Sequence, residues 1–342
     1  MGKKRIKKGD YRVTHDTFFD ETFGMPSFGV AFLKAKLPRK IRKQLDLDKL
    51  TVVWKKFRDE LFRETRPDIV YKVPIRGTDE HVNFHVIVEH KSFDDHSTIF
   101  QLWGYVRQLC VQDAKERLTD PETEERKGWP KNFQLSPVIP IIIHHGPTPF
   151  SGKTQLADLF YEIPGIKEYL PHLQAILVDL STIEEENLPR DPNAPELFVV
   201  LLIMKVIFNK DPETIIDKYE EILDELKPYS QMPRYRELIR KLLYYVAYNV
   251  EMPEAGVTRM ENKTRETTGD KTMPSVAQVF TDKGKVESKV EAILDVLEGR
   301  YSEVPQATKV AVAKVTDLAV LRRLTILASN CKSLAEFKKA LK

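Results

Sequence analysis

The chain has 342 residues, of which 42% are hydrophobic and 31% charged, as is typical of a globular protein. Its net charge of +3 includes five cations in the first eight residues, so the remainder carries 3 − 5 = −2 and is not a nucleic-acid binder by bulk charge. No apolar run reaches the roughly 18 residues of a membrane span. Cys110 and Cys331 lie far apart in sequence, which indicates a reducing compartment and a cytoplasmic protein without a membrane partner.

Residues 1–13 form a basic tail that either contacts phosphate or serves only as a solubilising end. After the tail, Thr14 or Asp16 can cap a helix whose apolar face includes Phe18, Phe19 and Phe23. A second helical segment is predicted over residues 28–37, before a proline.

Residues 67–89 predict one β-hairpin, because apolar residues alternate on both sides of turn-forming residues 76–80. If the hairpin folds symmetrically about Thr78 and Asp79, Asp68 faces Glu89 directly, with Cβ atoms about 4.5–5.5 Å apart. Lys91 lies two residues beyond Glu89 and therefore on the same face. The hairpin is expected to bury its apolar face and to present these three charged groups on the other, open face.

This trio has a chemical use. Carboxylate oxygens of Asp68 and Glu89, with the backbone carbonyl of His90, can hold one Mg²⁺, whose bound water becomes a better nucleophile. The Lys91 ammonium can orient that water or stabilise negative charge on a phosphate. The alternative interpretation is an ordinary surface cluster in which Lys91 pairs with a carboxylate.

Residues 97–112 predict a helix with two stripes. The buried stripe comprises Ile99, Leu102, Trp103, Val106, Leu109 and Cys110, and the polar stripe comprises Gln101, Tyr105, Gln108 and Gln112. An amide such as that of Gln101, one helix away from a metal site, can hydrogen-bond a water, a carboxylate or a phosphate. The alternative is a helix surface that happens to be rich in glutamine.

Two further strands are predicted at residues 137–145 and 175–180, so the chain is expected to form an α/β fold. His144 and His145 are adjacent on one of these strands and point to opposite faces, which favours structural roles over a shared metal ion. From residue 196 the pattern is helical. Residues 196–251 are interpreted as a helical extension, 252–275 as a linker and 276–342 as a small helical module.

Five segments occur in the order typical of one known family: HDTFFDETF, LDLDKL, RPDIVYKV, FHVIVEHKS and PVIPIIIHHG. Together they resemble the Rpn family of recombination-promoting nucleases, also called YhgA-like putative transposases. The resemblance covers about residues 14–250. Two departures are the Lys91 of Glu89-His90-Lys91, where many relatives have Gln, and His144, where relatives more often have Tyr.

The resemblance implies a PD-(D/E)XK nuclease domain over residues 14–195, in which helices flank a mixed sheet, with an all-helical C-terminal region. It implies that the catalytic residues are Asp68, Glu89, Lys91 and Gln101, and that Mg²⁺, with Mn²⁺ or Ca²⁺ as alternatives, is the cofactor. No nucleotide cofactor is implied. Gln101 and Tyr105 resemble the Q-x-x-x-Y motif of RecB-like nucleases, and Asp16 corresponds to a first-helix acid that often approaches the metal, although an N-cap explains it equally well.

Two functions follow as hypotheses. The first is a metal-dependent DNA endonuclease linked to recombination or mobile elements. The second is a catalytically silent factor that keeps the fold and associates with DNA or protein. An active transposase is a third interpretation, for which no second catalytic centre or recognisable DNA-binding motif is seen in the sequence. Because the chain carries one set of site residues, cutting both strands of a duplex favours a homodimer, with the C-terminal module as the candidate dimerisation element. The alternative is a monomeric nickase whose C-terminal helices only pack on the catalytic domain.

Overall fold

The structure is a computed structural model that describes residues 13–56, 67–89, 97–120, 123, 125, 128–209, 211–270, 275–301, 304–313, 315 and 317–341. The chain divides into two compact units. The sheet region comprises His15–Pro228, and the helical region comprises the residues from Tyr229 onward together with Val13 and Thr14. None of the helices in the described part of the chain is both long and apolar enough to cross a bilayer.

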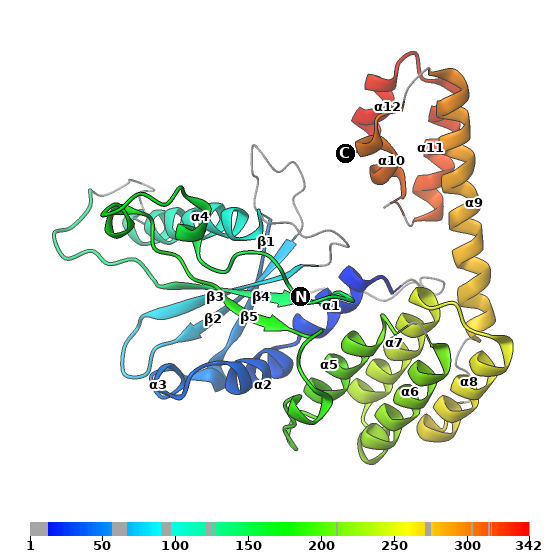
Figure 1. The fold of residues 1–342 in the computed structure, drawn as a ribbon, viewed down its shortest axis with the longest axis horizontal. Coiled ribbons are helices and arrows are strands. Elements are labelled where there is room, and N and C mark those ends of the chain that lie inside the picture. The colour runs from blue at the N-terminus through cyan, green and yellow to red at the C-terminus, as the bar shows by residue number, and fades with distance from the viewer. Residues whose placement is uncertain are drawn as a thin grey trace. The chain divides into compact units, whose positions relative to one another are not determined.

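The described strands of the sheet region form one five-stranded mixed sheet in sequence order (Figure 1). The first three pair antiparallel and the last three pair parallel. The strands are β1 (Thr51–Lys56), β2 (Pro67–Pro74), β3 (His81–Glu89), β4 (Val138–His144) and β5 (Ile176–Asp179). The predicted α/β mixed sheet is confirmed, and β1 is an additional strand that was not predicted from the sequence pattern.

The turn between β2 and β3 sets the register of the hairpin. Gly77 has a φ of 75°, which a residue without a Cβ adopts without steric cost. The amide of Ile75 donates to the carbonyl of Glu80 at 2.8 Å, so the turn is centred between Gly77 and Thr78. The predicted centre between Thr78 and Asp79 is therefore wrong, because it overlooked the position that Gly77 alone fits.

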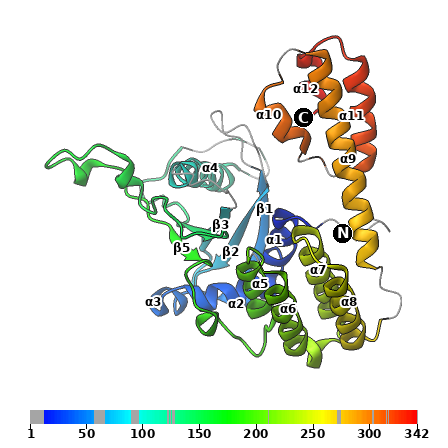
Figure 2. The same ribbon diagram turned by 45° about the vertical axis from the view of Figure 1, so that its right-hand side comes forward.

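One face of the sheet is covered by α1 (His15–Phe23) and α2 (Pro26–Lys36), as Figures 1 and 2 show. The predicted core stripe Ile69, Tyr71 and Val73 is fully buried there. The Tyr71 hydroxyl donates to the carbonyl of Phe23 at 2.6 Å. A Cβ at Gly29 would lie 2.8 Å from the Tyr71 ring, so this close approach of α2 to the sheet requires glycine.

The other face is covered by α4 (Thr98–Leu118), which is about one and a half turns longer than predicted (Figure 1). Ile99, Leu102 and Leu109 of its predicted apolar stripe are buried. Trp103 is 37% exposed, contrary to prediction, and its ring makes an edge contact with that of Phe100.

Short elements connect and complete this region. α3 (Arg39–Arg42) and the 3-10 turn η1 (Leu47–Lys49) lead into β1. The connection from β4 to β5 contains η2 (Leu156–Leu159) and η3 (Lys167–Tyr169), and η4 (Glu185–Asn187) follows β5.

α5 (Glu196–Val206) is buried along most of its length, and its Glu196 accepts a hydrogen bond from Ser27 of α2 at 3.1 Å. α6 (Pro212–Leu226) begins at an Asp211 cap and packs on α5. Both helices therefore belong with the sheet, and the division falls after Pro228 rather than at residue 195.

The helical region contains α7 (Pro233–Asn249), α8 (Glu254–Thr268), α9 (Val276–Arg300), α10 (Gln306–Ala313), α11 (Leu318–Asn330) and α12 (Leu334–Ala340). The predicted linker at 252–275 is corrected by α8. This helix is polar, but Met260 and Thr264 are buried, and the Thr264 hydroxyl donates to the Met260 carbonyl at 2.7 Å. Because a threonine hydroxyl can bond to the backbone of its own helix, a helix of polar sequence can bury such residues. α8 packs against α7 in this way.

Helices α9–α12 share a core of their own, as predicted for a small helical module. Its buried members include Ile293, Leu297, Leu321 and Phe337. The side chain of Ser333 caps α12 by accepting a hydrogen bond from the amide of Glu336.

Candidate active site

Asp68 and Glu89 occupy neighbouring strands at the same edge of the sheet. Ile69 pairs with Val86, so the register continued by one residue places position 68 opposite position 87. The predicted direct opposition of Asp68 and Glu89 is therefore wrong by two residues, because the turn is centred one residue earlier than expected. A shift of two preserves the face, so the two positions become diagonal neighbours, with Cα atoms about 7–8 Å apart.

The structure describes the backbone of Asp68 and Glu89 but not their side chains, and His90 and Lys91 lie outside the described residues. The catalytic roles of Asp68, Glu89 and Lys91, and the metal-binding role of the His90 carbonyl, therefore stay predictions. No group of three or more His, Cys, Asp or Glu residues that could hold a metal ion occurs among the side chains that the structure describes.

The sheet face that carries the diagonal pair is not open, contrary to prediction. Val70 lies two residues from Asp68 on this face and is only 1% exposed. It packs against Tyr105 and Leu109 of α4. The polar stripe predicted for α4 must therefore be corrected at Tyr105, whose side chain is buried against the sheet because the helix lies across this face.

Gln101 lies in the first turn of α4, at the end of the helix nearer the candidate site. The flanking residues Ile99 and Leu102 pack against Ile142, which is two residues from the end of β4. β4 pairs with β3 such that its last residue aligns with Glu89. The Gln101 side chain is half-buried, and its amide donates to the Ser97 hydroxyl at 2.8 Å. Helix packing thus places Gln101 near the sheet edge that carries Glu89.

His144 pairs with Glu89 in the parallel register and is buried. Its Nε2 lies 2.7 Å from the Thr148 carbonyl, and since a carbonyl only accepts, Nε2 carries the proton. Nδ1 then carries a lone pair in the neutral ring, and it has no hydrogen-bond partner among the described residues. A Cβ at Gly146 would lie 3.0 Å from this ring, so glycine makes room for it. Only a structural role was predicted for His144, and the sequence pattern holds no signal for this unsatisfied nitrogen.

His145 faces the opposite side of the sheet, as the alternation predicted. Its Nε2 lies 2.8 Å from the Met204 carbonyl, and its ring makes an edge contact with His15 at 5.0 Å. Burial lowers the pKa of His15, and the neighbouring Asp16 carboxylate partly opposes that shift. The start of α1, with Asp16, therefore lies near the end of β4, while a direct approach of Asp16 to the predicted metal stays untested.

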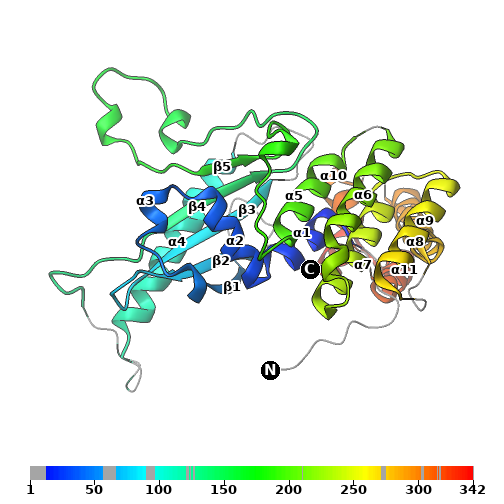
Figure 3. The same ribbon diagram turned by 90° about the horizontal axis from the view of Figure 1, so that it is seen from below.

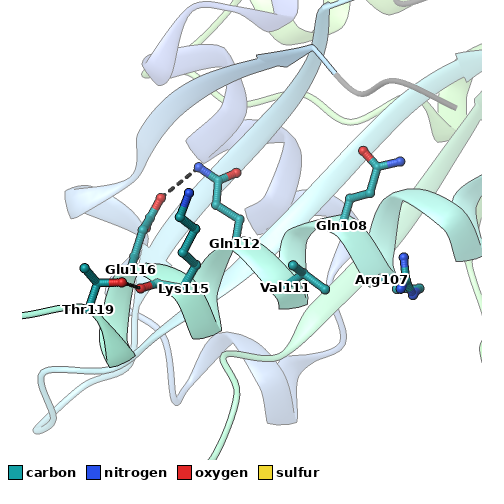
Figure 4. Close-up of a pocket in the computed structure, with 7 residues that line it drawn as sticks. All are labelled: Arg107, Gln108, Val111, Gln112, Lys115, Glu116 and Thr119. Atoms are coloured by element: carbon teal, nitrogen blue, oxygen red, sulfur yellow. Dashed lines mark hydrogen bonds between the residues drawn. The ribbon is translucent and has the colours of Figure 1, made fainter. Parts of the chain in front are cut away.

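A hollow of about 580 Å³ lies on the surface of α4, away from this edge (Figure 4). All of its lining residues come from the C-terminal half of α4 and its cap, and the Gln112 amide donates to Glu116 there at 2.8 Å. Gln101 is not among these residues. The hollow is therefore separate from the predicted site.

Comparisons with known proteins give a consistent result. The family described as "Putative transposase, YhgA-like" matches residues 13–232. "Recombination-promoting nuclease RpnD" of Escherichia coli O157:H7 is 26% identical over 210 residues, which cover 61% of this chain and 74% of that protein. "Putative inactive recombination-promoting nuclease-like protein YjiP" of Escherichia coli strain K12 is 32% identical over 91 residues, which cover 27% of this chain and 86% of that protein. No solved structure matches the chain.

Proposed function

This chain belongs to the "Putative transposase, YhgA-like" family, and on that premise we propose that it is a metal-dependent DNA endonuclease whose site is built around Asp68 and Glu89. A family relative is named as a recombination-promoting nuclease, which supports a role of this kind. The fold proposed for the sheet region is that of the PD-(D/E)XK nucleases.

The observation that carries the proposal is the strand register at one edge of the sheet. Asp68 near the start of β2 and Glu89 at the end of β3 share a face diagonally, and the packing of α4 brings Gln101 toward the same edge. Asp68, Glu89 and Gln101 thus come from three different elements, β2, β3 and α4, so only the fold can bring them to one end of the sheet. An accidental surface cluster does not require this arrangement.

The donor set fits a hard divalent cation. Two carboxylates on adjacent strands and the His90 carbonyl offer oxygen ligands only, which Mg²⁺ prefers, and diagonal neighbours remain within reach of a shared ion. Mn²⁺ and Ca²⁺ accept the same ligands. When bound, such an ion makes water more acidic and offsets negative charge on phosphate.

The chain's own groups would then perform the remaining work. The Lys91 ammonium would orient the attacking water or stabilise charge on the scissile phosphate. The Gln101 amide would hydrogen-bond a water, a carboxylate or the DNA backbone. A duplex cut on both strands needs two such sites or one site used twice, and a two-fold homodimer is the simplest assembly that supplies two.

A second candidate function rests on the relative that is named as inactive, which is 32% identical over its matched segment. In that case the chain binds DNA or protein without cleavage. Retention of Asp68, Glu89, Lys91 and Gln101 favours the active form, because the full set of expected residues is present.

A plasmid cleavage assay distinguishes the active endonuclease from the silent form. Supercoiled plasmid is incubated with the purified full-length protein, with and without Mg²⁺. We expect nicked or linear product only with the metal, and none with Asp68→Ala. Asp79→Ala is the matched control, since Asp79 is an exposed carboxylate in the turn at the other end of the same hairpin. No cleavage by the wild type under any metal supports the silent form, and equal cleavage by Asp68→Ala refutes the assigned site.

A further inference from the structure

One surface segment of the sheet region concentrates positive charge. Residues 34–43 contain six cations and no acidic residue, whereas the chain without its basic tail has a net charge of −2. A local excess of this size in a body that is negative overall requires an explanation, because like charges repel and cost stability unless they are paired or used.

The structure separates the paired cations from the unpaired ones. Lys34 forms an ion pair with Asp48 at 3.0 Å, and the Arg42 guanidinium donates to the Lys34 carbonyl. Arg39, Lys40 and Lys43 are exposed and form no ion pair with any residue that the structure describes. These three residues, on and directly after α3, are called the α3 surface below.

The α3 surface is anchored to the far end of the hairpin. The amide of Asp46 donates to the Pro74 carbonyl at 2.9 Å, and the amide of Arg76 donates to the Gln44 carbonyl at 2.8 Å. Leu45, which bridges to Ile75, is buried. The backbone that carries the cations is therefore held at a defined place at the end of β2, opposite to the end that carries Asp68.

The same region carries an acidic counterpart. α6 contains Glu213, Asp217, Glu220, Glu221, Asp224 and Glu225, with Lys218 as its single cation. Figures 1 and 3 show α3 and α6 at opposite ends of the sheet region. A polyanion is therefore repelled at α6 and attracted at α3, so the charge distribution orients an approaching ligand as well as attracting it.

We propose that the α3 surface binds the phosphate backbone of duplex DNA as a docking surface separate from the catalytic residues. This inference rests on the proposed function and identifies the surface that holds its substrate. Asp68 and Pro74 lie six residue steps apart on β2, which is about 20 Å along a strand. That length corresponds to about six base pairs of a duplex that rises about 3.4 Å per pair. The α3 surface thus contacts phosphates several base pairs from the bond that is cut.

The test compares two triple variants of the full-length protein. In one, Arg39, Lys40 and Lys43 are changed to Gln. In the control, Lys131, Lys153 and Lys167 are changed to Gln, which are exposed lysines elsewhere in the sheet region that also form no ion pair with a described residue. Each variant has three fewer positive charges than the wild type. Fluorescence anisotropy with a labelled duplex of about 30 base pairs is recorded in EDTA at several salt concentrations, so that cleavage does not interfere.

The α3 variant is expected to bind DNA roughly 10- to 100-fold more weakly, and the slope of log affinity against log salt should fall by about 0.9 for each phosphate that the protein no longer neutralises. The control should change little. Unchanged affinity and slope in the α3 variant, with wild-type plasmid cleavage intact, would overturn this inference alone. An equal reduction of affinity in both variants would show that only the net charge of the protein matters, and it would also overturn this inference. A changed mass by light scattering without a change in DNA affinity would overturn it as well, and would assign the surface to a second copy of the chain instead.

Discussion

The sheet region differs from the helical region in the acidic residues that it places at the ends of two neighbouring strands. In the sheet region, Asp68 and Glu89 stand at the ends of strands, where secondary structure does not require an acid. In the helical region, polar side chains bond to the backbone: the buried Thr268 hydroxyl donates to the Thr264 carbonyl, and the exposed Arg300 guanidinium donates to the Cys331 carbonyl. The proposed chemistry therefore belongs to the sheet region, and we expect the helical region to serve packing or assembly.

The largest expected effect in the sheet region, apart from removal of the carboxylates, comes from Lys91→Ala. Cleavage should fall by about 10²–10³-fold, because an ammonium aimed at developing phosphate charge acts only in the transition state. Lys72→Ala, a lysine of the same hairpin, is the matched control. Single-turnover plasmid cleavage measures this effect, and circular dichroism and DNA affinity check folding and binding. Near wild-type cutting by Lys91→Ala would contradict the prediction.

The helical region should respond to a core change in stability rather than in chemistry. Leu321→Ala removes a fully buried side chain of α11 and should lower the free energy of unfolding of this region by about 2–5 kcal/mol. Ile326→Ala on the same helix changes a side chain that is 64% exposed and should cost less than about 0.5 kcal/mol. Urea unfolding monitored by circular dichroism measures the free energy of unfolding of both variants.

Cleavage at a temperature where both Leu321→Ala and Ile326→Ala remain folded should equal that of the wild type. A cleavage defect in folded Leu321→Ala would contradict the expectation that the helical region takes no part in the chemistry.

Much of the fold followed from sequence pattern, for identifiable reasons. β4 and β5 are short apolar runs, and α5 and α6 lie where the pattern is predicted to become helical from residue 196. The C-terminal helices followed from apolar residues at helical spacing. In each case one segment carries its own signal.

The errors arose where the outcome depends on contacts between segments. The hairpin register depended on which turn residue takes a positive φ, and Gly77 moved it by two residues. The polar composition of residues 252–275 predicts a linker where the structure has the helix α8, because the few buried residues of this helix gain stability only by packing. Tyr105 was placed on a polar stripe, since only the docking of α4 on the sheet decides which side is buried. The residues proposed for the candidate site thus come from sequence alone and stay predictions, whereas their register across the strands could be read only from the structure.

A smaller effect should follow from Gln101→Ala. Removal of an amide that supports a water or a phosphate is expected to reduce cleavage by about 10-fold, in line with one hydrogen bond of about 1.4 kcal/mol. Gln112→Ala lies three turns further along the same helix and should leave the rate unchanged. If the two variants cut equally well, the role of Gln101 is confined to its bond with Ser97.

The smallest effect concerns pH. Burial lowers the pKa of His15 below its unfolded value near 6.5, so the unfolded state binds more protons in acid. Its contribution to stability is therefore present above about pH 6.5 and is lost as pH falls through the folded pKa. His15→Asn should reduce the pH dependence of unfolding between about pH 7 and 5 in urea titrations. An unchanged slope would show that His15 is not the group that titrates.

The most direct test of the central claim is a titration of Mn²⁺ into the full-length protein, monitored by electron paramagnetic resonance, for wild type, Glu89→Ala and Asp79→Ala. The account predicts one ion per chain in the wild type and in Asp79→Ala, with binding weakened at least about 10-fold in Glu89→Ala, because a ligand is removed. Binding by Glu89→Ala that equals that of the wild type, or no binding by the wild type, would contradict a metal site at this edge of the sheet.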